Sequence, residues 1–110
     1  MAESEPADAF AAGAFEGDQL LGVGLIGPEG EPGAWRVRGM ATAPEVRGRG
    51  AGTAVLETLL AHARERGATR VWASVRTPAR SLYERSGFRQ TSDQFELPEI
   101  GPHVIMSREV

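Results

Sequence analysis

Three glycines within six residues, in the run Arg47-Gly48-Arg49-Gly50-Ala51-Gly52, separate a segment of strand character from a segment of helix character. Glycine adopts backbone conformations that are closed to other residues, and it lets another group approach the main chain closely. Thr53–Arg66 follows, with apolar residues at the spacing of one helix face and Gly67 as its stop. The chain must therefore turn tightly from a strand into a helix, whose free amides and dipole attract anions.

Strand and helix signals continue on both sides of this turn. We predict strands over Ala9–Phe15, Leu20–Ile26, Trp35–Thr42, Arg70–Val75, Phe88–Leu97 and His103–Arg108, and helices over Thr53–Arg66 and Pro78–Ser86. The order β-β-β-α-β-α-β-β predicts an α/β fold of the α+β mixed-sheet type, with helices packed on the sheet.

The strand Trp35–Thr42 should place alternate side chains on opposite faces of the sheet. Simple alternation puts Trp35, Val37 and Gly39 on one face and Arg36, Arg38 and Met40 on the other. Gly39 within a strand also indicates a bulge or a close approach of another backbone.

The composition indicates one globular domain over residues 1–110, with residues 1–7 disordered. The chain contains no cysteine and two histidines, so we expect no metal site. No apolar run approaches the roughly 20 residues of a membrane helix, and no signal peptide is evident, which favours a cytoplasmic protein without membrane contact.

Charge is divided unevenly along the chain, whose net charge is −3. The first 35 residues carry seven acids and no base, and all twelve basic residues of the remainder are arginines. No dense basic patch with interleaved aromatic residues occurs, so we expect no nucleic-acid partner. The acidic third is a weak indication of a cationic acceptor.

Three kinds of phosphate-binding turn could account for Arg47–Gly52. A P-loop needs a lysine after its last glycine, and this chain has none. A dinucleotide fingerprint needs a third glycine where Thr53 stands, and an acid about 20 residues later. The remaining reading is a cradle for the pyrophosphate of coenzyme A.

On these residues the chain resembles the GNAT (Gcn5-related N-acetyltransferase) superfamily. Arg47, Gly50 and Gly52 fit the pattern Gln/Arg-x-x-Gly-x-Gly/Ala at the start of the family's central helix. Residues 79–88 fit a second block, Ala-x-x-Leu-Tyr-Glu-x-x-Gly-Phe. The resemblance extends from about Gly17 to the C-terminus and implies an acyl-CoA N-acyltransferase fold.

The resemblance also implies roles for individual residues. Acetyl-CoA would be held by the residues Met40, Ala41, Thr42, Arg47, Gly48, Arg49, Gly50, Ala51, Gly52, Thr53 and Arg76. The pantetheine arm would extend the sheet at the edge of the strand around Met40–Thr42, in a splay between this strand and Arg70–Val75. A backbone amide near Met40–Ala41 would stabilise the developing oxyanion. Tyr83 would protonate the departing thiolate after direct attack by a primary amine of a small molecule or peptide.

Several features depart from the family pattern. Arg76 replaces the usual Asn seven residues before the tyrosine, and the strand before the turn carries no carboxylate to act as a base. Glu31, Glu96, Glu99, His103 and a water chain stay open as candidates for the base. The chain begins where the family's second strand normally lies, so we expect a homodimer or part of a longer protein. A catalytically impaired acyl-CoA-binding or regulatory module is the alternative function.

Overall fold

The computed structural model describes residues 9–42 and 50–110. The disorder expected for residues 1–7 and the cofactor contacts expected of Arg47, Gly48 and Arg49 lie outside the described residues. All other site residues predicted from the sequence fall within them.

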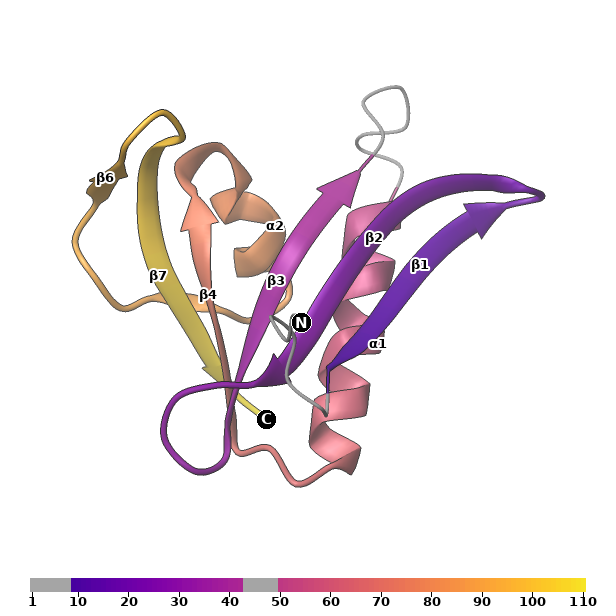
Figure 1. Cartoon of the computed structure of the whole chain (residues 1–110), viewed down its shortest axis with the longest axis horizontal. Helices are drawn as coiled ribbons and strands as arrows, with labels where there is room; N and C mark the ends of the chain where they lie inside the picture. Colours follow the sequence, from indigo (N-terminus) through magenta and orange to yellow (C-terminus); the bar gives the residue numbers. More distant parts are fainter. Residues whose placement is uncertain (1–8, 43–49) are drawn as a thin grey trace, which may run out of the picture.

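The described residues form one mixed sheet with helices (Figure 1). In chain order the elements are β1 (Phe10–Glu16), β2 (Gln19–Pro28), β3 (Ala34–Thr42), α1 (Ala51–Glu65), β4 (Arg70–Arg76), the 3₁₀ turn η2 (Thr77–Ala79), α2 (Arg80–Arg85), β5 (Arg89–Gln90), β6 (Phe95–Leu97) and β7 (Gly101–Glu109). The strand order is β1-β2-β3-β4-β7-β5, and β6 also pairs with β7. Only β3 and β4 run parallel among the described pairs, so the predicted mixed sheet is confirmed.

The core lies between the sheet and its helices. α1 buries the apolar face that its sequence spacing predicts, and it packs against β1, β2 and β3. The side chains at the centre of this core are fully buried, namely Ile26, Leu56, Leu59, Leu60, Val71, Val75, Val104 and Met106. α2 contributes Tyr83 and the following Phe88 to the same core.

A bulge interrupts the pairing of β2 with β3. Leu25 pairs with Arg38, whereas Val23, two residues away, pairs with Ala41, so β3 carries one extra residue here. Gly39 supplies it, with φ of +65°, a conformation that favours glycine. The bulge predicted from Gly39 is confirmed.

The predicted facing of Met40 is wrong. Because the bulge shifts the alternation by one residue, Met40 packs against the core with α1 and does not share a face with Arg36 and Arg38. A prediction from simple alternation does not count the extra residue, so it places Met40 on the wrong face of the sheet.

The predicted single strand Phe88–Leu97 is also wrong, since it divides into β5 and β6 around residues 91–94. The Ser92 hydroxyl accepts a hydrogen bond from the Ile105 amide at 2.9 Å, and the Thr91 amide donates to the Ile105 carbonyl at 2.8 Å. The Ser92 side chain therefore accepts the hydrogen bond from the Ile105 amide of β7, which the backbone of a continuous strand would have accepted. Pro78–Ser86 is likewise divided, into η2 and α2.

Candidate active site

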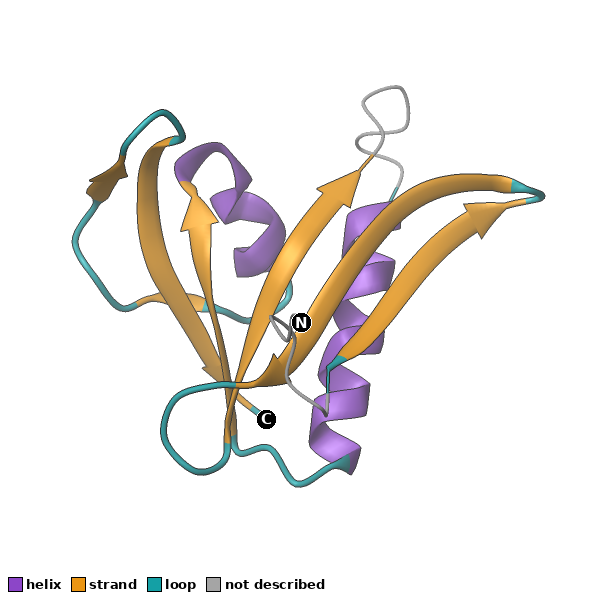
Figure 2. Ribbon diagram, in the orientation of Figure 1, coloured by secondary structure: helices purple, strands orange, loops and turns teal. Residues whose placement is uncertain are grey.

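An opening between β3 and β4 is the main irregularity of the sheet (Figure 2). The two strands pair only from Ala34 with Arg70 to Arg36 with Trp72. Beyond Arg36, β3 continues to Thr42 and β4 to Arg76 without pairing to each other. The splay expected from the family resemblance is therefore present. It leaves the β4-facing edge of residues 37–42 open to an extended ligand.

The amino end of α1 lies at the wide end of this opening, after β3. Gly50 is the residue that precedes the helix, and its φ of +87° is one that glycine adopts without strain. Its carbonyl accepts the first helical hydrogen bond, from Ala54 at 2.9 Å. No side chain of residues 9–42 or 50–110 caps this helix end, and its first turn carries no acid. The amides of Ala51, Gly52 and Thr53 have no acceptor within the described residues, as suits an anion site.

The two described glycines of the turn have different surroundings. A Cβ at Gly50 would meet no atom of the described residues within 4 Å, so none of those residues fills the space beside it. A Cβ at Gly52 would lie 3.3 Å from Thr42 Oγ1 and 3.4 Å from both Leu82 methyl groups. Gly52 therefore permits the close packing of the end of β3, the start of α1 and the side of α2.

Tyr83 lies on α2 with only 5% of its surface exposed. Its ring meets Phe88 edge to face, with centroids 5.2 Å apart. No hydrogen bond to its hydroxyl is found within residues 9–42 and 50–110. Burial raises the pKa of Tyr83 to about 12, because an ionised phenolate would lose its hydration. The hydroxyl therefore keeps its proton at neutral pH.

Arg76 stands at the end of β4, exposed, next to η2. β3 and β4 are parallel, so Arg76 and Thr42 end their strands at the same edge of the sheet as the amino end of α1. Within the described part of the chain no partner is recorded for its side chain. It is available to a ligand at this edge.

The candidates for the base are scattered. Glu31 pairs with Arg70 at 3.3 Å, near the narrow end of the opening. Glu96 lies on β6, and Glu99 in the β6–β7 turn, with φ of +66°. β7 and β4 separate both of these acids from the opening. His103 is buried, and its Nδ1 lies 2.9 Å from the Gly101 carbonyl. No hydrogen bond joins any of these four side chains to Tyr83 in the described part of the chain.

An ion-pair cluster at the narrow end of the opening was not predicted from the sequence. Glu29, in the β2–β3 loop, accepts hydrogen bonds from Arg36 Nη1 at 2.9 Å, from Arg38 Nε at 3.2 Å and from Arg38 Nη2. Trp72 Nε1 donates to the Glu29 carbonyl at 2.9 Å. These cations hold the pKa of Glu29 below its usual value, with Arg38 as the largest cause. In the sequence, this cluster is indicated by two arginines at alternate strand positions that follow an acidic loop.

These features fit the chemistry of coenzyme A. A pyrophosphate requires unpaired donors and space beside them, which the uncapped start of α1 and the open side of Gly50 provide. An extended pantetheine arm requires an unpaired strand edge, which β3 provides beyond Arg36. The described residues contain no group of acidic, histidine or cysteine side chains able to hold a metal ion. Among them there is also no helix long and apolar enough to span a membrane.

Comparison with known proteins agrees with this geometry. The family model of the acetyltransferase (GNAT) family matches residues 1–88. The Bacillus subtilis (strain 168) protein YitI, described as an uncharacterized N-acetyltransferase, is 30% identical over 113 residues, covering 94% of this chain and 73% of YitI.

Solved structures share the fold at lower identity. Escherichia coli ElaA superposes with a TM-score of 0.81 at 19% identity, over 94% of this chain and 70% of ElaA. An aminoglycoside 6'-N-acetyltransferase complexed with coenzyme A gives a TM-score of 0.79 at 14% identity, over 94% and 73%. The chain spans between 63% and 78% of the length of such structures. By its family match, the chain belongs to the GNAT family and is an acyl-CoA-dependent acetyltransferase whose cofactor is acetyl-CoA.

Proposed function

We propose that this protein transfers the acetyl group of acetyl-CoA to a primary amine by direct attack, with Tyr83 as general acid. The observation that carries the proposal is a buried, protonated phenol on the helix that packs against the start of α1. The cofactor supplies an activated thioester. The chain supplies an anion site, a strand edge and a proton donor.

Two features of the structure would hold the cofactor, namely the start of α1 and the unpaired edge of β3. The amides of Ala51, Gly52 and Thr53 would bind the pyrophosphate, with the space beside Gly50 left for its oxygens. The backbone of Met40, Ala41 and Thr42 would pair with the pantetheine arm, and Arg76 would reach a phosphate from the end of β4. Acetyl-CoA and the amine, once bound in a fixed orientation, need not meet by diffusion. This positioning would account for much of the rate acceleration.

Tyr83 would hand its hydroxyl proton to the thiolate sulfur as the bond from carbon to sulfur breaks. A phenol with a pKa of about 12 is a weaker acid than an ordinary thiol, whose pKa is about 8.5. Burial raises the pKa of the Tyr83 phenol, and it would also raise the pKa of a coenzyme A thiol formed beside it. The difference between the two pKa values is thereby reduced. The acetylated amine loses a proton in the same reaction, so the proton balance closes when Tyr83 is reprotonated.

Turnover measurements test this proposal. Purified protein is incubated with acetyl-CoA and a panel of primary amines, and free thiol is followed over time. We expect thiol release that depends on the amine, and a loss of roughly 10²–10⁴-fold in kcat for Tyr83→Phe. A protein that binds acetyl-CoA tightly but acetylates no amine would instead be the impaired binding module. The homodimer, the longer chain and the cytoplasmic location stay predictions of the sequence.

A further inference from the structure

We infer that the acceptor carries a carboxylate next to its amine, and that Glu29, Arg36 and Arg38, here called the Glu29 cluster, select it. The inference rests on the proposed function, since it concerns the second substrate of the same site. Its class is a small amino acid with a free α-carboxylate. Its evidence is the position, charge and hydrogen bonding of the Glu29 cluster.

The Glu29 cluster lies on the face of the sheet that is opposite to α1. Trp35 and Val37 of β3 face the core with α1, so Arg36 and Arg38 lie on the opposite face of the sheet. Arg36 belongs to the last residue pair that joins β3 to β4, and Arg38 follows where the strands have parted. An acceptor that enters the opening from this face therefore meets the Glu29 cluster.

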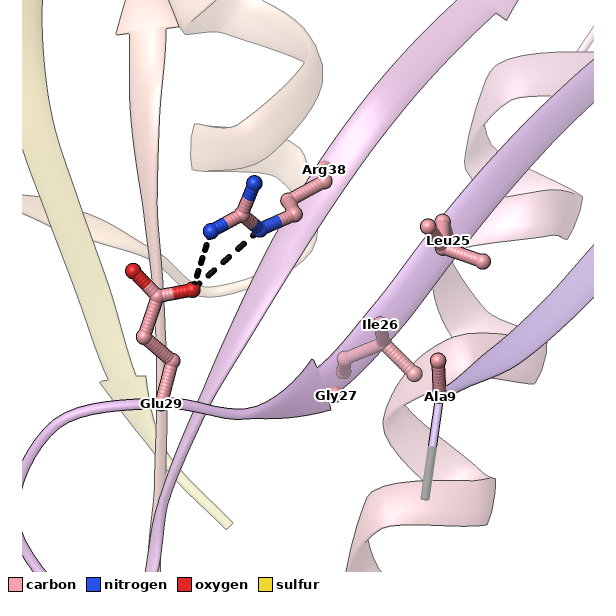
Figure 3. A pocket seen from close by; sticks show the side chains of 6 residues that line it. All are labelled: Ala9, Leu25, Ile26, Gly27, Glu29 and Arg38. Carbon is pink, nitrogen blue, oxygen red and sulfur yellow. Dashed lines mark hydrogen bonds and ion pairs between the residues drawn. The ribbon is translucent and has the colours of Figure 1, made fainter. Parts of the chain in front are cut away.

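The arrangement of the side chains fits this position. The Arg36 guanidinium lies over the Trp72 ring of β4, 4.8 Å from its centroid, and so bridges the two strands. In Figure 3 the Arg38 side chain leaves β3 toward Glu29, and the Glu29 carboxylate points back at it. The Trp72 bond to the Glu29 carbonyl fixes the loop that carries this acid. The cluster is thus held on both strands at the narrow end of the opening.

Charge decides which ligand such a cluster takes. Two guanidinium groups carry two positive charges, and the Glu29 carboxylate compensates one of them. The lowered pKa of Glu29 keeps the carboxylate ionised, so the excess stays at one positive charge at neutral pH. An ammonium group would meet a net positive site, whereas a carboxylate would be attracted.

Hydrogen-bond donors are likewise in excess. Glu29 receives bonds from Arg36 Nη1 and from Arg38 Nε and Nη2, and no other side-chain acceptor for these guanidiniums is found in the described part of the chain. Arg36 Nε is buried without an acceptor among the described residues. Buried donors normally find a partner. The side chains of Arg36 and Arg38 remain 27% and 47% exposed, so a carboxylate can reach them.

This inference reverses the weak indication of a cationic acceptor drawn from the acidic first third of the chain. Glu29 belongs to that third, and its carboxylate forms ion pairs with two arginines. The net charge of the Glu29 cluster is therefore positive, whereas the net charge of the first third of the chain is negative.

Matched acceptors provide the test. L-leucine and L-phenylalanine are compared with their carboxamides and with spermidine, at equal concentrations of unprotonated amine. We expect kcat/KM at least tenfold higher for each acid than for its amide, and lower still for spermidine. Arg38→Gln should lower kcat/KM for the acids by 10–100-fold and that for the amides by much less, so the preference for acids over amides is lost. Arg38→Lys should restore part of the preference, and Arg64→Gln, at an exposed position on α1, should change nothing.

A binding measurement separates this inference from the proposed function. N-acetyl-L-leucine and N-acetyl-L-leucinamide are titrated into the protein with coenzyme A present, by calorimetry or NMR. Tighter binding of the acid, lost in Arg38→Gln, supports the inference even where no amine is acetylated, an outcome that would refute only the proposed transfer. Equal binding of acid and amide, or amides acetylated as fast as acids, overturns the inference and leaves the acetyltransferase proposal standing.

Discussion

Gly24 of β2 and Met40 of β3 lie so close on the core side of the sheet that a Cβ at Gly24 would stand 2.6 Å from the Met40 sulfur. The same Cβ would lie 2.9 Å from Leu59 and Val55 of α1. We expect Gly24→Ala to lower the free energy of unfolding by about 1–3 kcal/mol, because atoms cannot be added to a packed core without displacement. Denaturant unfolding measures this.

Met40→Ala provides the control for Gly24→Ala, because it removes the nearest obstacle. The double variant should lose less stability than the sum of the two single variants, since the added methyl then occupies vacated space. Strictly additive losses would mean that Met40 and Gly24 do not share this contact.

The contact also shows where prediction from sequence succeeds and where it stops. Helix α1 was predictable because its apolar residues repeat at helical spacing and Gly67 follows its end. The observed helix differs from the prediction by two residues at its start and one at its end. The inward side of Met40 was not predictable, because the bulge at Gly39 adds one residue and reverses the facing that follows. A glycine in a strand indicates that a bulge is present but not its effect on each neighbour.

The candidate site divides in a similar way. Gly50 and Tyr83 could be named from the sequence because local motifs carry them, and their roles stay predictions. The Glu29 cluster was missed because its members meet only after the β2–β3 loop folds across the sheet and Trp72 binds it from β4. Such contacts depend on tertiary structure, and the alternate spacing of Arg36 and Arg38 does not by itself identify Glu29 or Trp72 as their partners.

Gly50 allows backbone strain and ligand binding to be tested separately. Gly50→Ala should cost about 1–2 kcal/mol of stability, because φ of +87° is unfavourable for a residue with a Cβ. It should retain much of the rise in Tm that coenzyme A produces, since the methyl enters open space.

Gly50→Glu imposes the same backbone strain but adds a negative charge beside the free amides of α1. We expect the rise in Tm with coenzyme A to disappear in this variant, because the carboxylate repels the pyrophosphate and competes for its donors. Thermal unfolding with and without coenzyme A measures both variants. An undiminished rise in Gly50→Glu would contradict the placement of the pyrophosphate at this helix.

Tyr83 is the only tyrosine of the chain, so tyrosinate absorbance reports on it alone. Its pKa should be about 12 in the folded protein, against about 10 in the unfolded chain. Because the folded-state pKa is raised, this linkage favours the folded state fully below pH 10 and is lost as the pH rises toward 12.

An absorbance titration of folded and denaturant-unfolded protein measures the two pKa values of Tyr83. Tyr83→Phe should lose less stability than the unchanged protein between pH 10 and 12, while near pH 7 the two should be about equally stable, since no hydrogen bond to the hydroxyl is found in the described structure. A tyrosinate signal near pH 10 from protein that is still folded would contradict a pKa raised by the burial of Tyr83.

Glu29 should make stability depend on acid and salt. The folded-state pKa is lowered, so the ion pairs contribute fully above the ordinary value of 4.5 and are lost as the pH falls through the lowered value. The carboxylate is about a third exposed, so we expect Glu29→Gln to cost no more than about 1 kcal/mol at pH 7 and low salt. The difference should shrink in high salt, and it should also shrink as the pH falls from 4.5 through the lowered pKa of Glu29, where the carboxylate gains a proton. Glu57→Gln, at an exposed position on α1, is the control and should show no such dependence. A Glu29→Gln effect that is unchanged by high salt would show that Glu29 contributes through its packing and not through its charge.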